Sequence, residues 1–139
     1  MSTRLRLSKE NSNKLNLLST KLGLRRNIIC RIAIGRSLAD KSSVKDLNFE
    51  DSSGFEFNRY TITGEQDVLF RALVSQYEKK NLNDFEYFSK YLRSHMERGV
   101  SLLYEEYNKI NSPIDFLISL FDKREKKSTQ KNLFYNKTE

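Results

Sequence analysis

Hydrophobic residues recur every three or four positions along most of the chain, and this spacing predicts a largely helical protein. A first helix is expected over residues 11–22, with Ser8 as its N-cap and Gly23 ending it in a left-handed turn. A second helix is expected to begin at Asn27 and to end near residues 38–40. The apolar faces of these two helices are formed by Leu15, Leu18 and Leu22, and by Ile28, Ile29, Ile32 and Ala33.

A long loop separates these helices from the rest of the chain. Residues 41–64 are rich in Ser and Gly and predict a structured loop with short extended pieces at 55–57 and 60–62. A loop of this length within a compact domain is uncommon and often functional. A third helix follows the loop, a fourth of about 22 residues starts at Asp84, and a short fifth starts at Pro113. The apolar positions of the third helix are Val68, Leu69, Ala72, Leu73 and Tyr77.

The predicted fold class is therefore all-α, a compact bundle of about five helices. Polar and apolar residues alternate from Arg4 to Leu7, which fits a short N-terminal strand or an extended arm resembling that of ribbon-helix-helix proteins. Several helices carry wide apolar faces in a small chain, so we expect the protein to self-associate. Residues 1–122 are predicted to form a single helical domain, and residues 123–139 a basic, flexible tail.

The distribution of charge along the chain indicates what kind of partner the protein binds. The chain has 139 residues and a net charge of +7. Residues 1–40 hold nine basic and two acidic residues, whereas residues 41–122 hold ten basic and fourteen acidic ones. The excess positive charge is thus confined to the two ends of the chain, which favours a surface that binds a polyanion such as DNA. The alternative is that the charge only keeps the protein soluble.

The N-terminal basic set is the strongest candidate for a binding surface. It consists of Arg4, Arg6, Lys9, Lys14, Lys21, Arg25, Arg26, Arg31 and Arg36. No acidic residue falls between Glu10 and Asp40, so nothing local is expected to neutralise it. Asn27 and the free backbone N–H groups at the start of its helix can also hold a phosphate. Because phosphate contacts carry no sequence information, we expect salt-sensitive DNA binding with weak sequence dependence.

Catalytic arrangements are nearly absent, so we expect the protein not to be an enzyme and to need no cofactor or metal. His95 is the only histidine, and we interpret it as a structural residue. Cys30 is the only cysteine, which excludes an intramolecular disulfide. We interpret Cys30 as a small buried apolar group; the alternative is a sulfur-accepting thiol whose pKa is lowered by Arg31. The chain has no apolar run of membrane-spanning length and no signal-peptide core, so a cytoplasmic location is expected.

Several short segments, taken in order, resemble a known family. They are Arg4-Leu5-Arg6-Leu7-Ser8, Leu15, Leu18, Leu22-Gly23-Leu24, Asn27, Cys30-Arg31-Ile32-Ala33, Ser37-Leu38, Gly54-Phe55-Glu56-Phe57-Asn58-Arg59, Thr61, Gly64-Glu65 and His95-Met96-Glu97-Arg98-Gly99. Their order and spacing from Arg4 to Phe121 resemble the DndE proteins of bacterial DNA sulfur modification. The Lys-rich tail from Lys123 lies outside this resemblance.

The resemblance implies a role in phosphorothioation, in which sulfur replaces a non-bridging oxygen of the DNA backbone. It implies that other proteins of the system mobilise sulfur, carry iron–sulfur clusters and hydrolyse ATP. The DndE member itself is implied to be a small helical protein that self-assembles as a tetramer and binds DNA, with nicked duplex as a target. It does not imply which basic residues touch DNA. On charge alone, Lys123, Lys126 and Lys127 are candidates for added nonspecific affinity.

Three alternatives remain open at this point. A ribbon-helix-helix regulator would place Arg4 and Arg6 against base edges and would prefer a palindromic sequence. A docking module for a larger protein would show no salt-dependent DNA binding. An enzyme that carries sulfur on Cys30 would lose its activity when this cysteine is replaced by serine.

Overall fold

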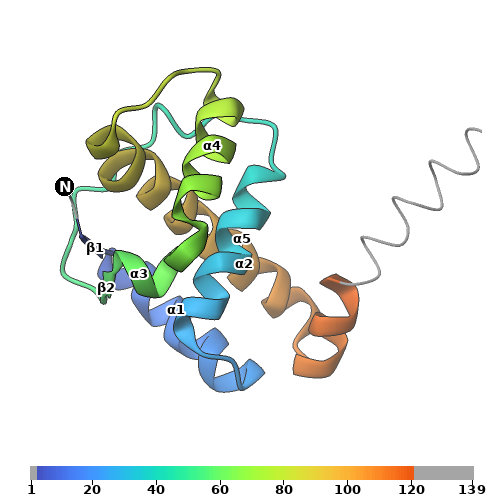
Figure 1. Cartoon of the computed structure of the whole chain (residues 1–139). Helices are drawn as coiled ribbons and strands as arrows, with labels where there is room; N and C mark the ends of the chain where they lie inside the picture. The colour runs from blue at the N-terminus through green and yellow to red at the C-terminus, as the bar shows by residue number, and fades with distance from the viewer. Residues whose placement is uncertain (1–2, 121–139) are drawn as a thin grey trace, which may run out of the picture. The chain divides into compact units, whose positions relative to one another are not determined.

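The computed structural model describes residues 3–120, so the predicted tail at 123–139 lies outside the described residues. The chain divides into two units, Met1–Glu105 and Glu106–Glu139, which are described separately. The prediction of a largely helical chain is confirmed (Figure 1). Among the described helices, none combines the length and the apolar character needed to cross a lipid bilayer.

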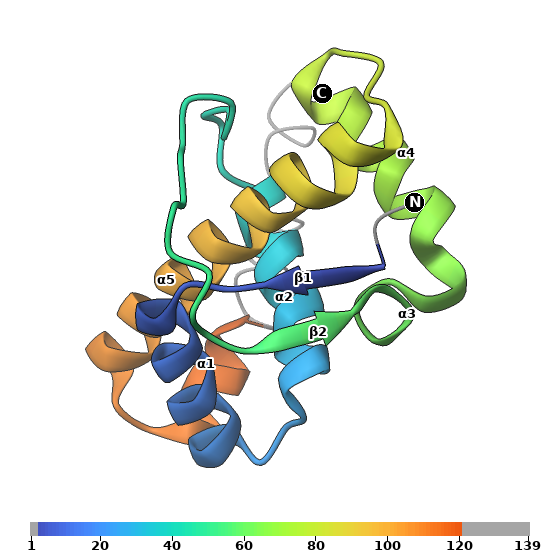
Figure 2. The same ribbon diagram turned by 90° about the vertical axis from the view of Figure 1, so that its left-hand side faces the viewer.

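A two-stranded ribbon lies at the start of the first unit (Figure 2). The strands β1 (Arg4–Arg6) and β2 (Glu56–Asn58) pair antiparallel, with Leu5 opposite Phe57. Leu5 and Phe57 point into the core, while Arg4 faces solvent, as the alternation of a strand requires. The predicted N-terminal strand is thus confirmed, and its partner comes from the same chain. This differs from the ribbon of ribbon-helix-helix proteins, in which strands of two chains pair.

Helix α1 (Lys9–Leu22) has the predicted caps and the predicted last residue, but it begins at Lys9 rather than at Asn11. The Ser8 hydroxyl accepts a hydrogen bond of 3.2 Å from the backbone N–H of Asn11, which satisfies one of the free donors of the first turn. Gly23 ends the helix with a φ of +68°, a left-handed conformation that favours glycine. The chain is thereby turned sharply into the next helix.

Helix α2 (Arg26–Leu38) begins one residue before the predicted cap. Arg25 occupies the N-cap position and forms no side-chain capping bond. The prediction of Asn27 as the cap is wrong, because its amide Nδ2 instead donates to the carbonyl of Thr61, 3.4 Å away. The buried face is also rotated from the predicted one, since Ile28 is exposed. The buried residues of α2 are Ile29, Cys30, Ala33, Ile34 and Ser37.

Helix α5 (Arg93–Ile110) crosses α2 at very short range. A Cβ atom at Gly99 would lie 1.9 Å from the carbonyl oxygen of Ala33, so only glycine fits at this position. The N-terminal half of α5 is buried on most sides, with Met96, Val100 and Leu103 in the core. The packing of α2 against α5 therefore depends on close backbone approach at one residue of each helix.

Between α2 and α5, one of the two predicted extended pieces is not a strand. The extended piece predicted at 55–57 corresponds to β2, but the one predicted at 60–62 is the short helix α3 (Arg59–Ile62). This helix forms because the Asn58 side chain accepts a 2.9 Å hydrogen bond from the backbone N–H of Tyr60. Local capping by one side chain therefore outweighed the strand propensity of the aromatic and β-branched residues.

A 3₁₀ turn, η1 (Gly64–Gln66), leads into the predicted third helix, α4 (Asp67–Glu78). Most of its predicted apolar positions are not buried, and among the described residues Val74 is the buried residue of this helix. The exposed fractions are 81% for Val68, 53% for Leu69 and 42% for Leu73. Periodicity correctly identified an amphipathic helix, but it does not specify what the apolar face contacts.

The long helix predicted from Asp84 is continuous to residue 110, but its first part has an unusual hydrogen-bond pattern. Residues Glu86–Leu92 form a π-helix, η2, which runs directly into α5. In the second unit, residues 113–120 form the predicted fifth helix. The rings of Tyr107 and Phe116 meet there edge to face, with their centroids 5.6 Å apart.

Candidate nucleic-acid interface

The tight turn between α1 and α2 brings three cationic side chains together. We call this region the α1–α2 corner, and its cations are Lys21, Arg25 and Arg26. Lys21 and Arg25 are exposed, and within residues 3–120 neither forms an ion pair. The Arg26 guanidinium stacks 3.9 Å above the centroid of the Phe55 ring and donates a 3.1 Å hydrogen bond to Asn16. Arg26 is therefore held in place with its charge unneutralised.

The N-terminus of α2 adds backbone donors to the same corner. The first turn of α2 contains no acidic residue, and Arg25 provides no side-chain cap. The first N–H groups of a helix have no partner within it, and the helix dipole makes this end positive. The α1–α2 corner therefore combines one fixed guanidinium and two further cations with a positive helix end, which is the chemistry of a phosphate site.

Three members of the N-terminal basic set form ion pairs with carboxylates, and two of them share one carboxylate. Arg4 and Arg6 each lie 3.4 Å from the carboxylate of Glu56, and Lys14 lies 3.3 Å from that of Glu10. The expectation that nothing local neutralises the set is wrong for these residues. Strand pairing brings Glu56 beside both arginines from far along the sequence, which no inspection of residues 1–40 reveals.

Arg31 is exposed, but its guanidinium forms hydrogen bonds within the fold. Its Nε donates to the carbonyl of Ile62 at 2.6 Å, and its Nη2 donates to the carbonyl of Thr61 at 3.2 Å. These carbonyls end α3, so Arg31 acts as a C-terminal cap that ties α3 to α2. Arg36 is half-buried in the last turn of α2, and the exposed Lys9 stands at the opposite end of α1 from the corner.

Cys30 and Arg31 do not form a reactive thiol site. The Cys30 side chain is completely buried, and burial raises the pKa of its thiol to about 12. The guanidinium of Arg31 is engaged by carbonyl groups, as described above. In this structure the thiol is neutral and out of contact with solvent, which is the environment of a structural cysteine.

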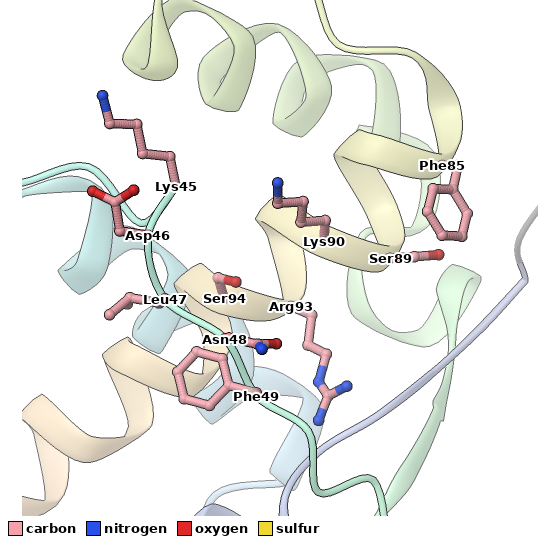
Figure 3. A pocket seen from close by; sticks show the side chains of 10 residues that line it. All are labelled: Lys45, Asp46, Leu47, Asn48, Phe49, Phe85, Ser89, Lys90, Arg93 and Ser94. Atoms are coloured by element: carbon pink, nitrogen blue, oxygen red, sulfur yellow. The ribbon is translucent and has the colours of Figure 1, made fainter.

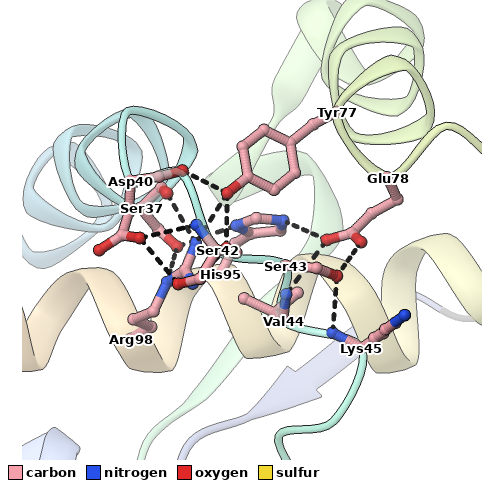
Figure 4. A network of polar contacts seen from close by, with 10 residues as sticks. All are labelled: Ser37, Asp40, Ser42, Ser43, Val44, Lys45, Tyr77, Glu78, His95 and Arg98. Atoms are coloured by element: carbon pink, nitrogen blue, oxygen red, sulfur yellow. Dashed lines mark hydrogen bonds and ion pairs between the residues drawn. The ribbon is translucent and has the colours of Figure 1, made fainter.

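His95 belongs to a buried polar network that connects α2, α4, α5 and the segment 40–45 (Figure 4). Its Nδ1 lies 2.9 Å from the Ser37 hydroxyl, and its Nε2 lies 3.3 Å from a carboxylate oxygen of Glu78. Burial, together with the charge of Arg98, lowers the pKa of His95 to about 4, although the nearby carboxylate of Glu78 acts in the opposite direction. Ser37 and His95 are wholly buried, so these groups lie beyond the reach of a substrate. The interpretation of His95 as a structural residue agrees with this geometry.

Arg98 completes this network with hydrogen bonds from three of its nitrogens. Its Nε donates to the Ser37 hydroxyl at 2.8 Å, and its Nη1 donates to the carbonyl of Ser42 at 2.6 Å. Tyr77 also donates to the Ser42 carbonyl, at 2.6 Å. The long loop after α2 is thereby fixed at its start. Over residues 3–120, no cluster of three or more His, Cys, Asp or Glu side chains has the arrangement of a metal site.

One part of this interface was not predicted. Phe55 was not among the predicted binding residues, yet its ring supports Arg26 at the α1–α2 corner. The signal was weak, because an aromatic residue in a loop does not indicate which cation will stack on it. The hypothesis of nine binding residues can therefore be narrowed. Arg4 and Arg6 are paired with Glu56, and Arg31 is bonded to Ile62, whereas Lys21, Arg25 and Arg26 at the α1–α2 corner form no ion pair within residues 3–120.

Those comparisons with known proteins that find a match all give the same family. A family profile described as DNA sulphur modification protein DndE matches residues 4–111. The fold is similar to the crystal structure of DndE from Escherichia coli B7A, involved in DNA phosphorothioation modification, with a TM-score of 0.59 and 21% sequence identity. That similarity covers 74% of this chain and 98% of the other.

A second similar structure is that of a DndE variant with two glycine-to-lysine substitutions, also involved in DNA phosphorothioation. Its TM-score is 0.58 at 20% identity, over 76% of this chain and 99% of that one. At these identities the two structures support the fold alone. No curated protein sequence matches the chain.

Proposed function

We infer that this chain, which belongs to the DndE family of DNA sulphur modification proteins, contributes to that modification by binding DNA phosphates at its α1–α2 corner. The observation that carries this proposal is the grouping of Lys21, Arg25 and Arg26 beside the uncapped, positive end of α2. Arginine forks match phosphate oxygens in pairs, and the stacking on Phe55 holds one such fork ready.

The protein acts as an accessory factor and catalyses no reaction by itself. The two side chains best suited to chemistry, Cys30 and His95, are both fully buried. Sulfur transfer is then the task of other proteins of the modification system. Its place of action is the bacterial cytoplasm, where the DNA is.

Nicked duplex is the preferred DNA in this proposal. A nick removes the covalent constraint on one strand, so the duplex bends toward a small basic surface at a lower elastic cost. The resulting closer approach lets more phosphates reach the α1–α2 corner. Binding remains weakly dependent on sequence, because the contacts are to the backbone.

The protein also self-associates, as a tetramer, through the exposed face of α4. Val68, Leu69 and Leu73 form an apolar strip on this helix that is largely open to solvent in the single chain. Covering such a strip in an oligomer removes apolar surface from water. Several α1–α2 corners on one particle then bind one DNA with higher avidity than a single corner. Sedimentation of wild type and Leu69→Glu tests this, since the variant is expected to be monomeric.

DNA binding is tested by fluorescence anisotropy with labelled intact and nicked duplexes across a salt series. The expected result for wild type is affinity that falls steeply with salt. The double variant Arg25→Glu/Arg26→Glu should bind more weakly, with a salt slope lower by about 2. The control is Lys41→Glu/Lys109→Glu, which makes the same change in net charge at two exposed lysines outside the N-terminal basic set.

Equal loss of affinity in both double variants would mean that total charge, not the α1–α2 corner, drives binding. No binding of wild type to either duplex at low salt would refute the proposal and leave the docking module as the better account. The ribbon-helix-helix alternative predicts instead that an Arg4→Ala/Arg6→Ala variant loses sequence preference. Pairing of both arginines with Glu56 argues against that alternative.

A further inference from the structure

A second site lies away from the α1–α2 corner, between the segment 45–49 and the helical stretch formed by η2 and the start of α5 (Figure 3). It is a cavity of about 430 Å³ within the first unit. This volume falls in the range of pockets that bind small molecules, roughly 300–1,000 Å³. The DNA phosphate contacts proposed above make no use of it.

The lining combines cations with aromatic rings. Lys45, Lys90 and Arg93 contribute positive charge, against the single carboxylate of Asp46. Phe49 and Phe85 supply flat apolar surface on the same cavity. Proteins that bind unpaired nucleotides use this combination of side chains: basic groups contact the phosphate, and aromatic rings stack on the base.

The backbone beside the cavity is unusual in a way that often marks a functional site. Ser89 and Lys90 belong to the π-helix η2, and Phe85 directly precedes it. π-Helices are rare and occur frequently at functional sites. Phe85 is 68% exposed, so this large ring is held at the rim of the cavity rather than in the core.

Arg93 supplies an unsatisfied donor at the same wall. Its Nη1 donates to the Ser52 hydroxyl at 3.0 Å, which fixes the guanidinium against the loop. Its Nε is buried and has no hydrogen-bond partner among the described residues. This nitrogen is closed to solvent, so a ligand in the cavity would reach it only after a shift of the Arg93 side chain.

We propose that this cavity holds one unstacked nucleotide of DNA, with its base against Phe85 and its phosphate on Lys45 and Lys90. The DNA source of that nucleotide rests on the proposed function, whereas the nucleotide chemistry rests on the cavity alone. Lys45, Lys90 and Phe85 are exposed at the rim, so the cavity is accessible to a nucleotide that is part of a longer strand. The site therefore recognises a locally unpaired or flipped nucleotide, in addition to the backbone contacts at the α1–α2 corner.

The test uses the full chain and three short labelled duplexes that share one sequence. One duplex is fully paired, one carries a single bulged adenosine, and one carries an abasic bulge at the same place. Wild type should bind the bulged adenosine about tenfold more tightly than the abasic bulge, because the base then stacks. Phe85→Ala should remove this difference and leave binding to the fully paired duplex unchanged.

Tyr60→Ala is the matched control, because Tyr60 is 69% exposed and lies outside the cavity. Lys90→Ala, compared with Lys41→Ala, tests the phosphate side, and thermal melting followed by circular dichroism checks that each variant folds. Competition by deoxyadenosine monophosphate separates the two sources of nucleotide: weak competition supports DNA, whereas competition at an affinity matching the bulged duplex indicates a free nucleotide.

Equal affinity of wild type for the adenosine and abasic bulges, or equal behaviour of Phe85→Ala and Tyr60→Ala, would overturn this inference. Salt-dependent binding to the paired duplex would then still support the proposed function. If no duplex binds but the monophosphate binds and Phe85→Ala abolishes it, the cavity is a nucleotide site and the proposed DNA function fails. If neither DNA nor the monophosphate binds, both proposals are refuted.

Discussion

Replacing Gly99 by alanine should destabilise the protein strongly, although alanine is the better helix former. The added Cβ would lie 1.9 Å from the carbonyl oxygen and 2.4 Å from the carbonyl carbon of Ala33. Ordinary contacts begin at 3.4 Å, so α2 and α5 would have to separate by roughly 1.5 Å. The atoms in the way are backbone, which cannot swing aside as a side chain can.

The magnitude follows from two opposing effects. Overpacking of a well-packed core costs about 1–3 kcal/mol, and a clash between two helix backbones belongs at the upper end. The higher helix propensity of alanine offsets about 1 kcal/mol of this. We therefore expect the Gly99→Ala variant to lose about 2 kcal/mol of unfolding free energy. Urea unfolding followed by circular dichroism measures it, from the shift in midpoint at unchanged slope.

Gly35 provides the matched control within the partner helix. It is exposed in α2, has no positive φ, and a Cβ there meets no atom within 4 Å. Gly35→Ala should therefore stabilise the protein by about 0.5–1 kcal/mol. If Gly99→Ala proved as stable as Gly35→Ala, the close crossing of α2 and α5 would not exist as described.

Three further predictions concern buried polar groups. Arg59 is buried with its guanidinium 2.7 Å from Asp67 and 2.8 Å from Asp84, so Arg59→Ala should lose about 3 kcal/mol in urea unfolding, and a neutral effect would contradict this pairing. The pKa of His95 falls from 6.5 to about 4 on folding, so between these pH values the unfolded chain is protonated at His95 and the folded chain is not. The free energy of unfolding should therefore drop by about 3 kcal/mol as the pH falls from 6.5 to 4. The drop should be smaller in the His95→Gln variant. A pH-independent difference between these two proteins would refute this. The Cys30 thiol should react with a disulfide reagent at mildly alkaline pH only after unfolding, since burial raises its pKa to about 12; fast reaction of native protein would show that the site opens.

The sequence by itself determined most of the helical framework, because its signals are local. The cap at Ser8 and the left-handed Gly23 each act within about one turn, so their effect can be read from neighbouring residues. The burial of Cys30 followed in the same way from the apolar residues around it. The ordered segments from Arg4 onward also carried the family relationship that the profile over residues 4–111 confirms.

Tertiary structure alone decided which cations remain available to bind. Strand pairing places Glu56 beside Arg4 and Arg6, and α3 captures Arg31, so part of the N-terminal basic set is used within the fold. Charge counting along the chain could not foresee this, because the neutralising groups arrive from elements far away in sequence. Arg26, in contrast, contacts the ring of Phe55, from the loop before β2, and the amide of Asn16, neither of which neutralises its charge.

The same reason explains the other features that the sequence did not reveal. The apolar face of α4 was recognisable by its spacing, yet whether it is covered depends on the packing of the whole chain. The π-helix at Glu86–Leu92 is a hydrogen-bond register that apolar spacing does not specify, and the cavity beside it depends on how the segment 45–49 meets this stretch. Hydrogen-bond register and the meeting of distant segments are set by the balance of the entire fold, whereas caps and periodicity are set within a few residues.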